Sequence, residues 1–125
     1  MTDAISNDYA LTPYFTVEGA DRFIGFMKAV FDAAVVKENR YEDGTLQHAR
    51  LRVEGCIIML NEATEDAPAN QSQMHLYVAN INATHDLALR HGAVSLMAPM
   101  MRPHGERMAG FKDPCDHIWW VAERV

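Results

Sequence analysis

The side chains best suited to chemistry lie on two stretches in which polar and apolar residues alternate. On the first, Gln73, His75 and Tyr77 occupy one face of an expected strand, with apolar residues between them. On the second, His48 and Arg50 lie opposite an apolar face in the same way. Because an apolar face must pack on a helix, we expect both polar faces to line a cavity, in which His48 and His75 approach each other.

These residue types fit more than one chemistry. His48, His75 and Gln73 together could bind a divalent cation through nitrogen and oxygen lone pairs, although the set contains no carboxylate. Either histidine could instead act as a general base, because imidazole titrates near neutral pH without a large perturbation. An arginine beside aromatic rings favours a flat or anionic ligand, through stacking and paired hydrogen bonds. Catalysis and simple binding therefore both remain open.

The overall composition is that of a globular protein. The chain has 125 residues, 49% of them hydrophobic and 22% charged, which is typical of one domain spanning 1–125. A net charge of −6 argues against nucleic acid as a partner, because phosphates require a basic surface. No apolar run approaches the roughly 20 residues of a membrane span, and the first residues lack the pattern of a signal peptide. We therefore expect a cytoplasmic protein that binds no membrane.

The elements that must position these residues occur in the same order twice. Each half contains a strand, a helix and three further strands, with a hairpin at Asp43-Gly44 and a helix N-cap at Asn80. The expected units are module one at about 11–63, a linker at 64–72 and module two at about 73–125. In the first helix, expected over 20–33, the apolar residues fall on one stripe: Phe23, Phe26, Met27, Val30 and Phe31. The pattern predicts an α+β fold of two βαβββ modules.

The two modules can be aligned with each other. Residues 12–17 match 73–78, which pairs Val17 with Val78. The last strands match as well, and they pair Glu62 with Glu123. A twofold repeat of this length indicates two similar modules packed side by side.

The order and spacing of these stretches resemble the vicinal oxygen chelate superfamily, which includes glyoxalase I, bleomycin-resistance proteins and extradiol dioxygenases. Within it, the chain is similar to the PhnB-like branch. The resemblance is carried by "LTPYFTVEGADRFIGFMKAVFDA", "HARLRVEGCIIMLNEA", "HLYVANINA", "HGAVSLMAP", "HGER" and "DPCDHIWW". It implies an incomplete β-barrel around a cavity, helices on the outside, and a homodimer. Where the family turn has glycine this chain has Asp116, which tolerates a left-handed backbone, and we expect His117 to hold the turn through a backbone hydrogen bond.

In metal-dependent members of that superfamily, four ligands come from the first and fourth strands of the two modules. By position, the resemblance places them on Thr12, Met59, Gln73 and Trp120. Tryptophan offers a metal no lone pair, a thioether is too soft for Mg, Mn or Zn, and threonine is a weak neutral ligand. We therefore expect no metal ion and no other cofactor.

The residues expected to face the cavity make it an aromatic-walled pocket with a few polar groups. They are Tyr14, His48, Arg50, Met59, Asn61, Gln73, His75, Tyr77 and Trp120, with Arg107 added at the cavity mouth by the resemblance. We favour a small-molecule-binding protein whose ligand is flat or anionic. One alternative is a lyase, isomerase or dioxygenase that uses nonstandard metal ligands, or His48 or His75 as general base. Another is an inert relic that acts through its dimer surface, with Met59 and Trp120 filling the cavity.

Overall fold

The computed structural model describes residues 10–124 and has the expected α+β fold. Two four-stranded sheets have the strand orders β1-β4-β3-β2 and β5-β8-β7-β6, and each is a βαβββ module. In both, the first strand pairs in parallel with the last and the other pairs are antiparallel. The elements are β1 (Tyr14–Val17), α2 (Ala20–Phe31), β2 (Ala34–Arg40), β3 (Leu46–Val53), β4 (Cys56–Glu62), β5 (Gln73–Tyr77), α3 (Ile81–Arg90), β6 (Val94–Met101), β7 (Arg107–Lys112) and β8 (Ile118–Glu123).

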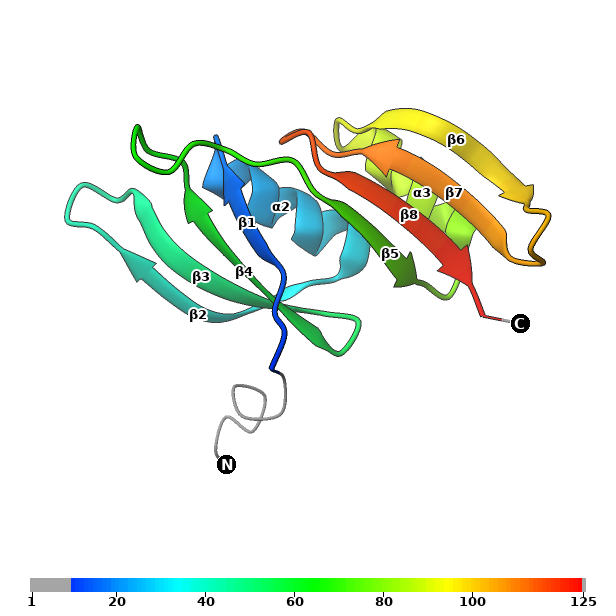
Figure 1. The fold of residues 1–125 in the computed structure, drawn as a ribbon, viewed down its shortest axis with the longest axis horizontal. Coiled ribbons are helices and arrows are strands. Elements are labelled where there is room, and N and C mark those ends of the chain that lie inside the picture. The colour runs from blue at the N-terminus through cyan, green and yellow to red at the C-terminus, as the bar shows by residue number, and fades with distance from the viewer. Residues whose placement is uncertain (1–9, 125) are drawn as a thin grey trace.

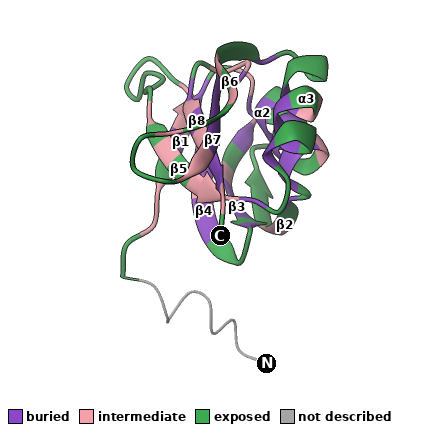
Figure 2. Ribbon diagram, turned by 90° about the vertical axis from the view of Figure 1, so that its right-hand side faces the viewer, coloured by how far each residue is buried: buried purple, intermediate pink, exposed green. Residues whose placement is uncertain are grey.

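Both helices lie on the same side of the two sheets (Figure 1). Seen from the side, the helices form one layer and the strands the other (Figure 2). The opposite side of each sheet, here called its open face, carries half-exposed residues such as Met59 and Trp120. The two sheets share no strand pairing within residues 10–124, so no closed barrel forms. None of the helices described is long and apolar enough to cross a bilayer.

The two modules share one apolar core on the helix side of the sheets. The stripe expected on the first helix is buried throughout, and it faces both sheets. Phe26 and Phe31 of α2 contact Phe111 of β7, with ring centroids 6.1 Å apart in each pair. Phe31 also contacts Trp119 of β8 at 5.1 Å, and Phe15 of β1 stacks on the same indole at 5.7 Å. A helix of module one therefore completes the core of module two.

A glutamate from the last strand of each module closes the first turn of that module's helix. Glu62 accepts hydrogen bonds from the backbone nitrogens of Gly19 and Ala20, at 2.9 and 2.8 Å. Glu123 accepts one from the nitrogen of Ile81 at 2.9 Å, beside the expected cap at Asn80, whose side chain accepts from Ala83 at 3.0 Å. Orphan N–H groups at a helix start favour a nearby carboxylate. The internal repeat that aligns Glu62 with Glu123 thus has a structural cause.

The turn before β8 is organised around a buried carboxylate. Asp113 accepts hydrogen bonds from the backbone nitrogens of Cys115 and His117, at 2.7 and 3.1 Å, and from the Trp119 indole at 2.8 Å. Asp116 has φ 71°, as expected for the residue that replaces glycine. Burial raises the pKa of Asp113, and the three hydrogen bonds oppose that rise.

His117 is fully buried, and its backbone closes this turn as expected, because its carbonyl oxygen accepts a hydrogen bond from the backbone nitrogen of Asp113 at 2.8 Å. Its side chain does not bond to the turn. Its Nδ1 accepts a hydrogen bond from the backbone nitrogen of Ser72 at 3.0 Å, so the ring anchors the linker instead. The ring packs edge-on against Phe15 at 4.7 Å and Phe23 at 5.9 Å. Burial lowers the pKa of His117, because a charged imidazolium would lose its hydration among these rings.

Candidate ligand-binding site

The indole of Trp120 lies against the backbone of the neighbouring strand at Gly110. These residues are directly paired between β7 and β8, and a methyl group at position 110 would lie only 2.2 Å from the Trp120 ring. Glycine is therefore the one residue that leaves room for the ring in this place. The indole nitrogen of Trp120 donates a hydrogen bond to Gln73 Oε1 at 2.8 Å, which fixes the ring's orientation. The result is a flat aromatic surface on the open face of the second sheet.

A cavity of about 340 Å³, here called the Trp120 cavity, lies beside this surface. Its lining combines apolar and basic side chains: His75, Met97, Arg102, His104, Met108 and Trp120. The guanidinium of Arg102 forms no ion pair with any carboxylate in the described part of the chain, and its Nη1 lies 3.9 Å from the Met100 sulfur. An unpaired guanidinium beside a flat ring suits a planar anion.

One carboxylate organises the polar side chains at the edge of the Trp120 cavity. Glu106 Oε1 lies 3.1 Å from His75 Nε2 and 3.2 Å from His104 Nε2, and Glu106 Oε2 accepts a hydrogen bond from the Tyr77 hydroxyl. These donors, the Tyr77 hydroxyl first, lower the pKa of Glu106 to about 2. The same bond raises the pKa of Tyr77, because a phenolate would lose it and face a negative carboxylate. Glu106 thus stays ionised and orients two imidazoles.

The open face of the first sheet carries the other half of the expected site. Tyr14 packs against His48 with ring centroids 5.9 Å apart, and Asn61 accepts a hydrogen bond from Thr16 at 2.7 Å. Arg50 lies beside Met59, and its buried Nε has no hydrogen-bond partner within residues 10–124. Burial, followed by the nearby charges of Arg50 and Lys37, lowers the pKa of His48. This face therefore carries basic side chains, and burial disfavours the charged form of its histidine.

The structure does not bring His48 and His75 together, contrary to our expectation. His48 precedes Ala49, which pairs with Leu60 near the end of β4. His75 lies at the opposite end of that strand, where it lines a small apolar cavity with Cys56. The strands β4 and β1 also separate His48 from the second sheet. The His48–His75–Gln73 cluster expected from alternation alone therefore does not form.

Arg107 also lies away from the position expected for it. It pairs with Glu123 across the strands, and alternation turns both toward the helix side, away from Trp120. Arg107 Nη2 donates to Asn82 Oδ1 of α3 at 3.4 Å, and Nη1 lies 3.8 Å from Glu123 Oε2. Arg107 thus supports the start of α3, and Arg102 is the arginine that reaches the Trp120 cavity.

The four positions that correspond to family metal ligands do not offer a metal-binding set. Thr12 precedes the first strand, and Met59 presents only a thioether. Gln73 is the one good donor, and its oxygen already accepts the Trp120 N–H. Among residues 10–124 no group of three or more His, Cys, Asp and Glu side chains is arranged to hold a metal ion. These four residues do not fit a resident divalent cation.

Several residues of the site were missed by the sequence analysis, namely Met97, Arg102, His104, Glu106, Met108 and Gly110. The two-residue alternation of side chains along a strand could have placed Glu106 and Gly110. Positions 108 and 110 share one side of β7, and Glu106, just before the strand, continues the same alternation. Only a glycine can lie beneath a large ring paired with it. Placing Gly110 under Trp120 puts Glu106 on the open face and Arg107 on the other.

Comparisons with known proteins agree with this architecture. Residues 9–121 match the family model described as Glyoxalase/Bleomycin resistance protein/Dioxygenase superfamily. The uncharacterized protein Rv0887c of Mycobacterium tuberculosis is 30% identical over 135 aligned positions, covering 99% of this chain and 79% of that protein. Among solved structures, the PhnB protein from Bacillus cereus has a TM-score of 0.78 at 16% identity, covering 93% of this chain and 100% of that one. TioX from Micromonospora sp. ML1 has a TM-score of 0.73 at 19% identity, covering 92% and 96%.

Proposed function

The chain belongs to the glyoxalase/bleomycin resistance protein/dioxygenase superfamily, and we propose that it binds a flat, anionic small molecule in the Trp120 cavity without a resident metal ion. The likeness to the PhnB protein supports a place in the PhnB-like branch. The main observation behind this proposal is that the Trp120 ring packs directly on the backbone of Gly110. One face of the indole is occupied by the strand backbone, and the ring borders a cavity of about 340 Å³.

The charges around the cavity support an anionic ligand. Arg102 lines it without an ion pair in the part of the chain described, so its hydrogen-bond donors are available to a carboxylate. Glu106 is not among the residues that line the cavity, and its carboxylate is already engaged by Tyr77, His75 and His104. Met97 and Met108 supply polarizable contacts for the edges of a ring.

The hydrogen bond between Gln73 and Trp120 supports ligand binding without a metal ion. The carbonyl oxygen of Gln73 fixes the Trp120 ring, so a cation at the inherited position would have to break this bond and would gain no carboxylate. The measurement is elemental analysis of protein purified without chelator and incubated with Mn, Ni, Zn and Fe(II). Near-stoichiometric metal that is lost in His75→Ala or His48→Ala would contradict the metal-free proposal.

The test of the ligand class uses three related probes: naphthoate, its uncharged analogue naphthamide, and the non-aromatic anion cyclohexanecarboxylate. We expect naphthoate to bind at least about tenfold more tightly than either analogue, measured by calorimetry and by quenching of Trp fluorescence. Trp120→Leu and Arg102→Gln should each weaken naphthoate binding to a similar extent. Arg90→Gln, which removes an exposed arginine paired with Asp86 on α3, is the matched control. Equal binding of naphthamide, or unchanged binding to Trp120→Leu, would refute the proposal.

A specific contact favours one enzymatic alternative. His75 borders the Trp120 cavity and is oriented by Glu106, which is the arrangement of a general base and its positioning carboxylate. His48 lacks such a partner among the described residues, and its neighbours include cations. If a bound ligand exchanges a carbon-bound proton with D₂O, and His75→Gln abolishes the exchange, an isomerase or lyase would replace the binding protein.

We also propose that a second copy of the chain covers exposed apolar residues. Val94 is 61% exposed and Met101 59% exposed on the edge strand β6, and Tyr14 is 46% exposed on the open face of the first sheet. Uncovered edges and apolar patches of this kind favour self-association. Light scattering coupled to gel filtration should give a dimer, and Met101→Lys should shift it toward monomer. A monomer at every concentration would contradict this.

A further inference from the structure

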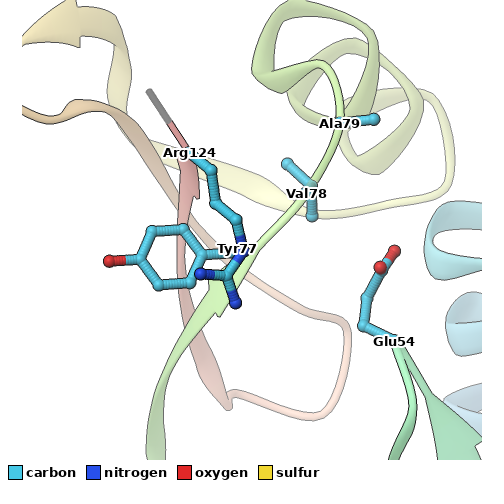
Figure 3. Close-up of a pocket in the computed structure, with 5 residues that line it drawn as sticks. All are labelled: Glu54, Tyr77, Val78, Ala79 and Arg124. Atoms are coloured by element: carbon cyan, nitrogen blue, oxygen red, sulfur yellow. The ribbon is translucent and has the colours of Figure 1, made fainter.

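A second pocket, separate from the Trp120 cavity, lies at the junction of the two modules. It has a volume of about 250 Å³ and is found where β5 and β8 end, opposite the turn between β3 and β4. Figure 3 shows Arg124 and Tyr77 on one side of it and the Glu54 carboxylate on the other. Its walls are formed by Glu54, Tyr77, Val78, Ala79 and Arg124. Module one contributes only Glu54, and module two contributes the rest.

The guanidinium of Arg124 is held in place by an aromatic ring rather than by an acid. Its Cζ lies 4.3 Å from the centroid of the Tyr77 ring, and it forms no ion pair with any carboxylate in residues 10–124. The Tyr77 ring is itself fixed, because its hydroxyl donates to Glu106. Stacking orients the planar guanidinium and leaves its N–H groups available to bind a carboxylate with two parallel hydrogen bonds.

Glu54 presents the opposite charge across the same pocket. It lies in the two-residue turn after β3 with φ 49°, a left-handed conformation that directs this exposed side chain away from the strand. In the described chain its carboxylate has neither a hydrogen bond nor an ion pair. The pocket therefore holds a cation and an anion on facing walls, neither of them neutralised by the other.

We propose that this pocket binds a small zwitterion of the α-amino-acid class, with its carboxylate on Arg124 and its ammonium group on Glu54. A lone anion would be repelled by Glu54 and by the nearby carboxylates of Glu106 and Glu123, which line an adjoining hollow with Tyr77 and Arg124. A lone cation would be repelled by Arg124. Only a molecule that carries both charges is attracted by both Arg124 and Glu54.

The space next to the pocket fits the rest of such a molecule. A further hollow of about 350 Å³ shares Glu54, Tyr77 and Arg124 with the pocket and adds Cys56, His75 and Leu76. The side chain of an amino acid held by its two charges would point into this hollow. Leu76 gives it an apolar contact there, so medium-sized aliphatic amino acids fit best.

The experiment uses leucine and two analogues that each lack one charge. Leucine has both groups, isocaproate lacks the ammonium and isoamylamine lacks the carboxylate, while the aliphatic part stays the same. We expect leucine to shift the amide NMR signals of Val78 and Ala79 saturably, with a millimolar dissociation constant. Each analogue should bind at least about tenfold more weakly, because each loses a charge-assisted hydrogen bond. Equal shifts with isocaproate, or no saturable shift up to about 50 mM leucine, would overturn the proposal.

Two variants test the separate contributions of Glu54 and Arg124 to leucine binding. Glu54→Gln keeps the side-chain size, Arg124→Gln shortens the side chain, and each removes one charge. Both residues are exposed, so we expect folded proteins with at least about tenfold weaker leucine binding. Glu65→Gln, an exposed linker glutamate, is the control and should bind as the wild type does. Trp120→Leu should also leave leucine binding unchanged, which separates this pocket from the Trp120 cavity. Wild-type affinity in both charge variants would refute the assignment.

Discussion

Replacement of Gly110 by alanine tests whether the Trp120 ring is seated on the strand as described. A methyl group at this position would lie 2.2 and 2.4 Å from two carbons of the indole, well inside van der Waals contact. The backbone of β7 is fixed by pairing on both sides, so the ring must move instead. If it moves, it also loses the hydrogen bond from its nitrogen to Gln73.

The expected magnitude follows from three contributions. Overpacking at a well-fitted site costs about 1 to 3 kcal/mol, and loss of the exposed hydrogen bond to Gln73 costs about 0.5 to 1.5 kcal/mol. Alanine is favoured over glycine within a strand by about 0.5 to 1 kcal/mol, which offsets part of the loss. We therefore expect Gly110→Ala to lower the free energy of unfolding by about 1 to 3 kcal/mol.

A double-mutant cycle with Trp120→Ala isolates the contact. Without the indole, Gly110→Ala should be neutral or stabilising by up to about 1 kcal/mol, so the two changes should couple by about 1 to 4 kcal/mol in urea denaturation. NMR provides an internal control, because the Trp120 indole N–H signal should move while that of Trp119, bonded to Asp113, should not. An equal effect of Gly110→Ala in both backgrounds would refute the seating of the ring.

Three further outcomes are expected. Asp113→Ala leaves three buried or half-buried donors without an acceptor, so the free energy of unfolding should fall by about 3 to 5 kcal/mol in urea titrations, and a loss below about 1 kcal/mol would contradict the network. Because the folded-state pKa of His117 lies below its unfolded value of about 6.5, the unfolded chain binds more protons below that pH. The contribution of His117 to the free energy of unfolding should therefore be fully present above about pH 6.5 and be lost as the pH falls. His117→Asn should weaken this pH dependence, and an unchanged pH profile in the variant would contradict the role of His117. Glu106→Gln should lower the pKa of Tyr77 toward its ordinary value, measured by phenolate absorbance with Tyr77→Phe as the reference.

Local pattern predicted much of this molecule correctly. The alternation of residues 73–77 placed Gln73 and His75 on the open face because one side of β5 packs on the core and the period of a strand is two. Asn80 and Asp116 took their expected conformations, since a helix cap and a left-handed turn depend on only a few neighbouring residues. These features are set by contacts close in sequence.

The failed expectations concern contacts between elements that are distant in sequence. His48 and His75 each lie on the predicted face, yet where two faces meet depends on how the shared core orients the sheets, and alternation carries no information about that. Arg107 was misplaced because the sequence "HGER" does not show where the loop ends and strand parity begins. The pocket between Glu54 and Arg124 could not be predicted either, because the two residues come from different modules and lie far apart in sequence.

The paired caps at Glu62 and Glu123 bear on how a chain of this kind arose. Each module closes its helix with a carboxylate from its own final strand, so this closing contact lies within each module. Its core is not complete in the same way, because Phe31 of one module packs on Trp119 of the other. An ancestor of half this length would have been a single module with an uncovered apolar side. We expect it to have folded only as a pair of identical chains, and gene duplication would then have replaced a concentration-dependent assembly with an intramolecular one.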